Sequence, residues 1–369
     1  MNRKYDALAL LSGGLDSILA MRTVMDQGLA VLGLHFTTPF FGKPHLIPFW
    51  REHYGIEVEA VDIDSEFVAM LLGDPSQGFG KWLNPCIDCK ITMLGRAAAL
   101  LPAYGAKFLI SGEVVGQRPM SQRSDALNVI TKRAGVRDLL LRPLCARNLP
   151  PTPMEESGLV DRDGLLDWRG RGRKPQYELA GRYGFTEIPT PAGGCCLTEV
   201  QGSARFARLL MHRPEPEPVD FRLARAGRQL WAGSHWLAFG RKAEDNDALE
   251  SCVIPGDYVF RLADFPGPLA VARPLAGEWD AGAVHDAAAL VASYATRARR
   301  HFEATGQPVR VVVRRGVKSG AGGEIVAVAP SRDTALPWAE PQPAAVGEWK
   351  KNRAARPSRA PLAPAGDTA

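Results

Sequence analysis

The short stretch Ser12-Gly-Gly-Leu-Asp-Ser17 combines residue types that can bind a phosphate group. Its two glycines allow a tight turn in which several backbone N–H groups approach an anion, and the hydroxyls of Ser12 and Ser17 can donate further hydrogen bonds. A carboxylate such as Asp16 makes sense beside phosphates if a Mg²⁺ ion bridges them. The plainer alternative is a strand–turn–helix connection in which Ser and Asp only cap the helix.

Cysteines are the second set of residues that could take part in catalysis or bind a metal. Cys86 and Cys89 have C-x-x-C spacing just before a predicted helix, Lys90–Leu101, whose positive end should lower a thiol pKa. Cys195 follows two glycines, which let the backbone fold closely around a metal or a substrate. The three thiols could ligate an iron–sulfur cluster, carry sulfur as a persulfide or disulfide, hold a structural zinc, or be inert and buried. The isolated Cys145 and Cys252 are expected in the core.

The elements that must position these residues follow from hydrophobic patterning. Unbroken or alternating apolar runs predict strands, and runs with helical spacing predict helices between them, which indicates a parallel α/β sheet. Ligands of such sheets bind beyond the carboxyl ends of the strands, where Ser12 and Phe36 follow or end predicted strands. The predicted strands are Ala7–Leu11, Val31–Phe36, Glu57–Asp62 and Phe108–Ser111, and the predicted helices are Asp16–Gln27, His45–Tyr54 and Met93–Leu101.

The phosphate-binding stretch resembles the signature of the PP-loop ATP pyrophosphatases. This resemblance implies a twisted parallel sheet of the adenine nucleotide alpha hydrolase-like type, cleavage of ATP between its α and β phosphates, and adenylation of a substrate. The segment Ser111–Gln122 resembles the corresponding segment of tRNA 4-thiouridine synthases. The nucleotide-site residues implied in this way are Ser12, Gly13, Gly14, Leu15, Asp16, Ser17, Phe36, Gly112, Glu113, Gln117 and Ser121.

The cysteine motifs resemble the thiouridine-forming branch of the same superfamily. Asn84-Pro-Cys-x-x-Cys89 is similar to its first motif, and Gly193-Gly-Cys195 to a third-cysteine motif of bacterial relatives. The resemblance implies that Cys86, Cys89 and Cys195 are catalytic and hold a [4Fe–4S] cluster, with Asp16 catalytic beside them. Cys196 stands where relatives tend to have Leu.

The second half of the chain changes in composition. Residues 1–150 are expected to form the ATP-binding domain, residues 151–213 a basic extension that completes the site, and residues 331–369 a disordered tail. In residues 214–330, Gly227-Arg228 and Glu244-Asp-Asn246 resemble motifs of the NFACT-R RNA-binding module. By this resemblance Arg222, Arg225, Arg228, Arg241 and Lys242 would contact phosphates; the alternative is a solvated basic face. The run Trp168-Arg-Gly-Arg-Gly-Arg-Lys174 poses the same alternatives.

Composition limits the functions to consider. A chain of 369 residues with 46% hydrophobic residues is long enough for two or three folded domains, and the net charge of +5 suits an anionic partner without requiring one. No apolar run is long enough to predict a membrane span, and the apolar N-terminal segment has no cleavage-site pattern, so we expect a cytoplasmic protein.

Together, the motifs and the resemblances that they carry imply an ATP- and Mg²⁺-dependent tRNA sulfurtransferase that adenylates a uridine carbonyl oxygen and replaces it with sulfur, with 4-thiouridine favoured over 2-thiouridine. Its expected partners are tRNA, a sulfur donor and, as a candidate assembly, a second copy of the chain. Two other hypotheses remain: an amide or C–N ligase that acts on a small molecule, and an RNA-binding adaptor with a vestigial ATP site.

Overall fold

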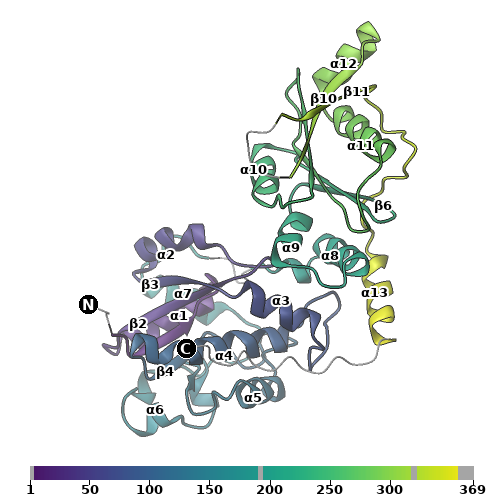
Figure 1. Ribbon diagram of the computed structural model, residues 1–369. Coiled ribbons are helices and arrows are strands. Elements are labelled where there is room, and N and C mark those ends of the chain that lie inside the picture. The colour runs from purple at the N-terminus through teal and green to yellow at the C-terminus, as the bar shows by residue number, and fades with distance from the viewer. Residues whose placement is uncertain (1–3, 190–193, 317–321, 356–369) are drawn as a thin grey trace. The chain divides into compact units, whose positions relative to one another are not determined.

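The computed structural model describes residues 4–189, 194–316 and 322–355, which form two compact units. The first unit runs to Thr198 and the second begins at Glu199 (Figure 1). The sequence predicted boundaries after residues 150 and 213 instead. The difference arises because residues 151–198 pack into the core of the first unit, where Met154, Val160 and Leu179 are buried in the same cluster as the first strand.

The first unit is built on a parallel sheet in the order β3-β2-β1-β4-β5, which confirms the predicted fold class. Leu8 of the central strand lies opposite Leu32 on one side and Leu109 on the other. Parallel strands covered on both faces are apolar throughout, as the fully buried first strand is. The strands are β1 Ala7–Leu10, β2 Val31–Thr37, β3 Glu57–Asp62, β4 Phe108–Ser111 and β5 Leu140–Leu141.

Helices form a layer on each face of this sheet. Helix α1 packs on β1, β2 and β4 and contacts α7, whereas α4 packs on β1 and β4 and contacts α3 and α5 (Figure 1). The α-helices of the first unit are α1 Leu15–Met25, α2 Ile47–Tyr54, α3 Asp64–Leu72, α4 Cys86–Tyr104, α5 Ser124–Arg133, α6 Pro153–Glu156 and α7 Lys174–Arg182. Short 3-10 turns span Pro44–Leu46, Ala146–Asn148, Arg162–Gly164 and Cys196–Thr198.

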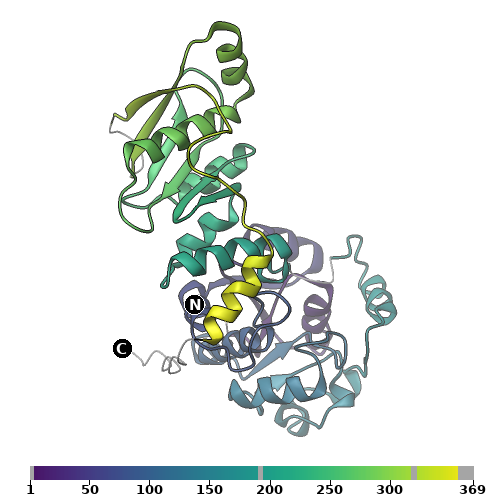
Figure 2. The same cartoon turned by 90° about the vertical axis from the view of Figure 1, so that its right-hand side faces the viewer.

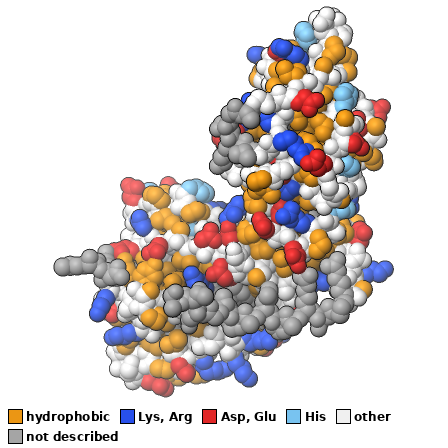
Figure 3. Space-filling view, in the orientation of Figure 1, with side chains coloured by type: hydrophobic (Ala, Val, Ile, Leu, Met, Phe, Trp, Pro, Cys, Tyr) orange, Lys and Arg blue, Asp and Glu red, His pale blue; other side chains and the backbone are white. Residues whose placement is uncertain are grey.

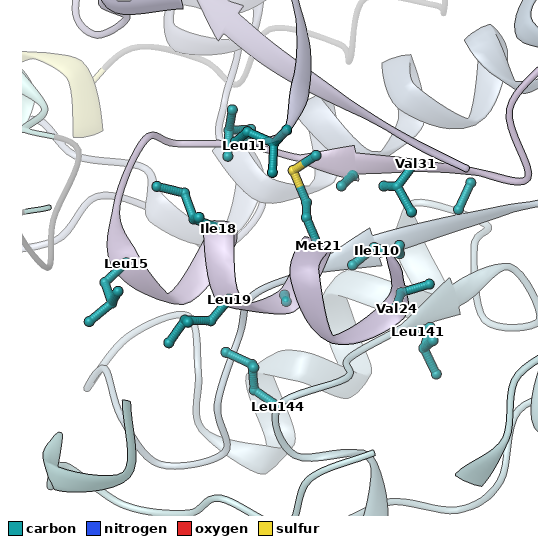
Figure 4. Packing of buried hydrophobic residues seen from close by; sticks show 14 of the residues in the cluster. Leu11, Leu15, Ile18, Leu19, Met21, Val24, Val31, Ile110, Leu141 and Leu144 are labelled. Atoms are coloured by element: carbon teal, nitrogen blue, oxygen red, sulfur yellow. The ribbon is translucent and has the colours of Figure 1, made fainter. Parts of the chain in front are cut away.

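The core between α1 and the sheet holds the first turn of α1 in place. Ile18, Met21 and Val24 project from α1 and are fully buried with Val31 and Ile110 of the strands (Figure 4). Burying one such side chain stabilises the fold by about 1.5–3 kcal/mol. The loop that precedes α1 is therefore anchored at both ends, by a buried strand and by a buried helix.

Helix α4 begins earlier than the sequence predicted. The prediction placed both cysteines in a loop before Lys90, but the helix starts at Cys86, directly after Pro85. Asp88 in its first turn accepts hydrogen bonds from the backbone N–H and the hydroxyl of Ser76, at 2.9 and 2.6 Å, which secures this helix end.

Within the described ranges, no helix combines the length and the apolar character needed to cross a membrane.

The second unit is an antiparallel sheet with helices, in agreement with the predicted α+β character. Its strand order is β11-β10-β8-β9-β7-β6. The strands are β6 Arg228–Ala232, β7 His235–Phe239, β8 Tyr258–Leu262, β9 Ala270–Arg273, β10 Val309–Arg315 and β11 Glu324–Val328. The helices are α8 Val200–His212, α9 Pro218–Arg225, α10 Ala243–Ser251, α11 Ala281–Ser293, α12 Thr296–Thr305 and α13 Ala344–Ala354.

A buried arginine ties α9 to this sheet. Arg273 on β9 donates hydrogen bonds to Asp257, at 2.7 and 2.9 Å, and to Asp220 of α9, at 2.8 Å. All three side chains are almost completely buried. Burial alone would lower the pKa of Arg273, but the two carboxylates outweigh it and raise that pKa, so the guanidinium stays charged.

The segment after residue 330 differs from the disordered tail that its composition predicted. Ala339 pairs through its backbone with Trp231 at the edge of the sheet, and α13 packs against α8 (Figure 2). Val346 and Trp349 are buried in α13, so a few large apolar residues are enough to order this segment. Residues 356–369, the rest of the predicted tail, lie outside the described residues.

Candidate active site

A cavity of about 300 Å³ lies in the first unit beyond the carboxyl ends of β1, β2 and β4. Its walls contain residues of the phosphate-binding stretch, namely Ser12, Gly14, Asp16 and Ser17, and the three motif cysteines, Cys86, Cys89 and Cys195. Phe36, Gly112, Glu113 and Ser121 also line it. A second hollow of about 430 Å³ lies elsewhere, beside Tyr5, Arg51 and Glu57. The cavity at the strand ends therefore collects most of the predicted site residues.

The loop before α1 is held by hydrogen bonds among its own residues. The Ser17 hydroxyl donates to the Gly14 carbonyl at 2.8 Å, and the two serine hydroxyls, Ser12 and Ser17, lie 3.3 Å apart. Gly13 has a φ of 75°, and a Cβ there would stand 2.2 Å from the Trp50 ring. A side chain could not be placed at this turn, which explains the glycine physically.

Two predicted loop residues, Gly13 and Leu15, are not among the residues that line the cavity. Leu15 is fully buried in the core, and Gly13 is half-buried at the turn, where the Trp50 ring leaves no room for a Cβ. They shape the loop, whereas Ser12, Gly14 and Ser17 line the cavity. The backbone at the start of α1 can thus present N–H groups to an anion.

Asp16 is the most constrained polar residue of the site. The side-chain amide of Gln117 donates to its Oδ2 at 2.6 Å, and Arg173 Nη1 lies 3.4 Å from the same oxygen. Its other oxygen, Oδ1, is buried and has no hydrogen-bond partner in the described part of the chain. Burial raises the pKa of the Asp16 carboxyl, while Arg173 and Gln117 oppose that rise. An acceptor oxygen without a donor in the wall of a cavity suits a Mg²⁺ ion.

Gly112 and Glu113 follow β4, but they serve the fold as well as the cavity. A Cβ at Gly112 would stand 2.6 Å from the carbonyl oxygen of Asp16, so glycine allows β4 to approach α1 closely. The buried Glu113 carboxylate pairs with Arg142 at 3.0 Å and with Lys90 at 3.8 Å. Burial would raise the pKa of Glu113, but the two cations outweigh it and hold that pKa below its usual value.

The three motif cysteines come together at the cavity although Cys195 is far from the other two in sequence. The Asn84 side-chain amide donates to Cys86 Sγ at 3.2 Å. The pKa of the Cys89 thiol is raised, first by burial and then by Cys195 and Cys86 nearby. The prediction that the helix N-terminus lowers the pKa of such a thiol is therefore wrong for Cys89, where burial is the largest effect.

The remaining cysteines lie outside this wall. Cys145 is fully buried and donates to the Glu113 carbonyl at 3.2 Å, and Cys252 is buried in the second unit, as expected for core thiols. Cys196 is buried, and its backbone N–H donates to the Phe40 carbonyl at 3.0 Å. Gly193 of the third-cysteine motif lies outside the described residues.

The three thiols can be compared with the ligand sets of a zinc ion and of an iron–sulfur cluster. In the residues described, no three His, Cys, Asp or Glu side chains are grouped as the ligands of one metal ion would be. A structural zinc ion requires four such ligands around one point. In a [4Fe–4S] cluster each thiolate ligates its own iron, so three thiols in the wall of one cavity match it in donor chemistry.

Several cavity residues escaped the sequence analysis. Lys90 and Arg118 add cations to the wall, and His35 and Asn84 add polar groups. The His35 ring is neutral, because its Nε2 accepts a hydrogen bond from the Lys43 backbone at 2.7 Å and burial lowers its pKa. Position at the end of a predicted strand was the signal for His35; Arg118 had none beyond its place within the Ser111–Gln122 segment.

Comparisons with known proteins agree with this picture for the first unit. Residues 3–148 match the family model described as "Thiamine biosynthesis protein (ThiI)". The chain is 28% identical over 114 residues to a probable tRNA sulfurtransferase of Thermococcus kodakarensis, a match that covers 30% of each protein. It is 32% identical over 119 residues to the tRNA-specific 2-thiouridylase MnmA of Nitratidesulfovibrio vulgaris, covering 29% of this chain and 34% of that protein. The chain thus spans about a third of the length of these relatives.

Solved structures give weaker similarities. A predicted subunit of a tRNA methyltransferase from Methanocaldococcus jannaschii has a TM-score of 0.31 at 15% identity and covers 48% of this chain and 75% of that one. The NMN synthetase of Francisella tularensis has a TM-score of 0.26 at 15% identity, covering 51% and 81%. The family match includes the phosphate-binding stretch, Cys86 and Cys89, and it ends before Arg173 and Cys195.

Proposed function

We propose that this protein is an ATP-dependent tRNA sulfurtransferase, and that 4-thiouridine is its product. The observation that supports this most directly is one cavity whose wall contains both a phosphate-binding loop and three thiols. The matches to sulfur-transferring tRNA enzymes agree with it. A small-molecule ligase that uses ammonia would not need the thiols.

The first half of the proposed reaction activates the uridine. Its carbonyl oxygen attacks the α-phosphorus of ATP, the bond to the β-phosphate breaks, and pyrophosphate leaves. Backbone N–H groups at the start of α1, with Ser12 and Ser17, bind the phosphates. Oδ1 of Asp16, the buried oxygen without a hydrogen-bond donor among the described residues, would hold Mg²⁺, which supplies charge neutralisation at the leaving pyrophosphate.

In the second half, a sulfur nucleophile attacks the activated ring carbon, and AMP leaves with the former carbonyl oxygen. Cys86, Cys89 and Cys195 are the residues that would hold a [4Fe–4S] cluster, which could present the incoming sulfur when bound. In the competing route one of these thiols carries the sulfur as a persulfide, a second thiol then cleaves the mixed disulfide formed with the ring, and the resulting protein disulfide is reduced by an external thiol. Both require an external sulfur donor.

We assign the second unit to tRNA binding, on its resemblance to the NFACT-R module. Several of the cations predicted to contact phosphates already have acidic neighbours: Arg228 pairs with Glu340 at 3.2 Å and Arg241 with Asp245 at 3.1 Å. On the face shown in Figure 3, Lys and Arg side chains of this unit stand among Asp and Glu. Phosphate contact there would exchange surface ion pairs, which are worth about 0–1 kcal/mol each. A homodimer remains the candidate assembly.

The test is a reaction with purified protein, unmodified tRNA, MgATP and sulfide. We expect AMP to form only with tRNA present and a nucleoside with sulfur at position 4 to appear by mass spectrometry. Asp16→Asn should abolish both products in a folded protein, because the amide cannot replace the carboxylate at the metal. Asp167→Asn, an exposed control, should retain both. AMP formation without thionucleoside would contradict the proposal.

A further inference from the structure

Arg173 differs from the other cations of the basic run in where it points. Arg169, Arg171 and Lys174 are exposed, as expected for a surface loop. The side chain of Arg173 is only 22% exposed, and its Nη1 lies 3.4 Å from Asp16 Oδ2 in the loop before α1. The sequence suggested one basic surface segment, but the fold exposes three of these cations to solvent and places Arg173 beside the candidate site.

The backbone of this segment is attached to the site. The N–H of Gly170 donates to the Val115 carbonyl at 2.8 Å, and Val115 and Arg169 form a parallel bridge. Gln176, in the first turns of α7, is buried and donates to Gln117 at 2.9 Å. Backbone contacts before Arg173 in the chain and a side-chain hydrogen bond after it therefore keep Arg173 beside the loop that precedes α1.

The contact with Asp16 uses only a small part of the hydrogen-bonding capacity of the Arg173 guanidinium. Arginine has five N–H donors in a planar fork that matches phosphate oxygens two at a time. Among the described residues, the Arg173 side chain makes one polar contact, the approach of 3.4 Å to Asp16. Gln117 contacts the same oxygen at 2.6 Å, so Asp16 is oriented without Arg173.

We propose that Arg173 is a ligand of the nucleotide phosphates, and that its contact with Asp16 is the position it takes before ATP binds. The inference rests on the proposed use of ATP and adds a residue outside the matched family region. On MgATP binding the guanidinium would leave Asp16 Oδ2 for the phosphates, while Oδ1 of Asp16 would hold the metal. Arg118 lines the cavity and supplies a cation there besides Arg173, which lies next to the cavity residue Asp16.

The competing explanation is that Arg173 only neutralises Asp16. The two explanations predict opposite effects of removing the guanidinium. A phosphate ligand strengthens ATP binding, so its loss weakens it. A residue that only occupies Asp16 competes with the metal, so its loss leaves MgATP binding unchanged or strengthens it.

The test is calorimetric binding of MgATP and of adenosine to the full-length protein. We expect Arg173→Ala to weaken MgATP binding by roughly 10- to 100-fold, since charge-assisted hydrogen bonds are lost, and to leave adenosine binding unchanged. Arg173→Lys, which keeps the charge without the fork, should fall between. Arg182→Ala, an exposed arginine of the same helix, should match the wild type.

Either variant of Arg173, provided that it folds, distinguishes a phosphate ligand from a residue that only neutralises Asp16. If Arg173→Ala does not fold by circular dichroism, Arg173→Lys carries the comparison. MgATP affinity equal to or above that of the wild type would overturn the assignment of Arg173. Failure of the wild type to bind MgATP would count against the proposed function itself and would take this inference with it.

Discussion

The side-chain amide of Gln176 donates a hydrogen bond of 2.9 Å to the amide oxygen of Gln117. Gln117 in turn donates to Asp16 at 2.6 Å, so a relay of buried amides joins helix α7 to the loop before α1. Because all three side chains are buried, each partner has little access to water as a substitute. The orientation of Asp16 thus depends on a residue far along the chain.

Replacement of Gln176 should affect both stability and the site. Gln176→Ala leaves the Gln117 oxygen buried without its donor, at a cost of about 1–3 kcal/mol in unfolding free energy. Asp16 should also lose its fixed orientation, so MgATP binding should weaken. Urea denaturation and calorimetry measure the two effects. Tyr177→Ala, at an exposed neighbouring position, should change stability by less than about 0.5 kcal/mol.

Gly112 should be intolerant of any side chain. In Gly112→Ala the new Cβ would stand 2.6 Å from Asp16 O and 2.7 Å from Ser17 Cα, backbone atoms that cannot rotate away. We expect a loss of about 1–3 kcal/mol in stability and weaker nucleotide binding, because the loop must shift. Gly95→Ala in α4 meets no atom within 4 Å and should stabilise the protein by about 0.5–1 kcal/mol. Thermal and urea unfolding of both variants would show the contrast; equal behaviour would contradict the close packing of β4 on α1.

The Glu113–Arg142 pair should give a distinctive pH dependence. The pKa of Glu113 is below its ordinary value of 4.5, so the pair stabilises the native state above that pH, and the contribution is lost as the pH falls through the lowered pKa. Arg142→Met leaves a buried carboxylate with only the more distant Lys90, and should cost about 3–5 kcal/mol at neutral pH.

In Arg142→Met the pKa of Glu113 should rise, because the Arg142 guanidinium no longer opposes the effect of burial on the carboxylate. Its loss of stability relative to the wild type should therefore shrink as the pH is lowered toward 4.5. The control is Arg147→Met, whose exposed pair with Asp167 should be worth less than about 1 kcal/mol. Urea unfolding at several pH values measures the difference, and a loss that grows on acidification would refute this account.

The motif cysteines should be separable from the core cysteines by metal content. If they hold a [4Fe–4S] cluster, anaerobically purified protein should be brown with about four irons per chain. Cys86→Ala, Cys89→Ala and Cys195→Ala should each lose iron and thiolation. Cys145→Ala and Cys252→Ala, at buried positions outside the cavity wall, should keep both. An iron-free, fully active enzyme with a sulfur-loaded cysteine would instead support the persulfide route.

Local sequence determined the features whose causes are local. The stretch Ser12–Ser17 places glycines, hydroxyls and a carboxylate within one turn, and the apolar runs on either side define the strand and helix that carry it. Cys86 and Cys89 are three residues apart, so both thiols lie close to the N-terminal end of the same helix, α4. Such features depend on a few neighbouring residues, so they can be read without the fold.

Tertiary structure decided which distant residues join them. Arg173 approaches Asp16 across 157 positions, and Gln176 reaches Gln117 across 59, contacts that no periodicity encodes. The direction of the Cys89 pKa shift was also a tertiary matter, because burial and the distant Cys195 raise that pKa. Burial and charge at a point in space depend on every segment packed there, and those segments come from the whole first unit.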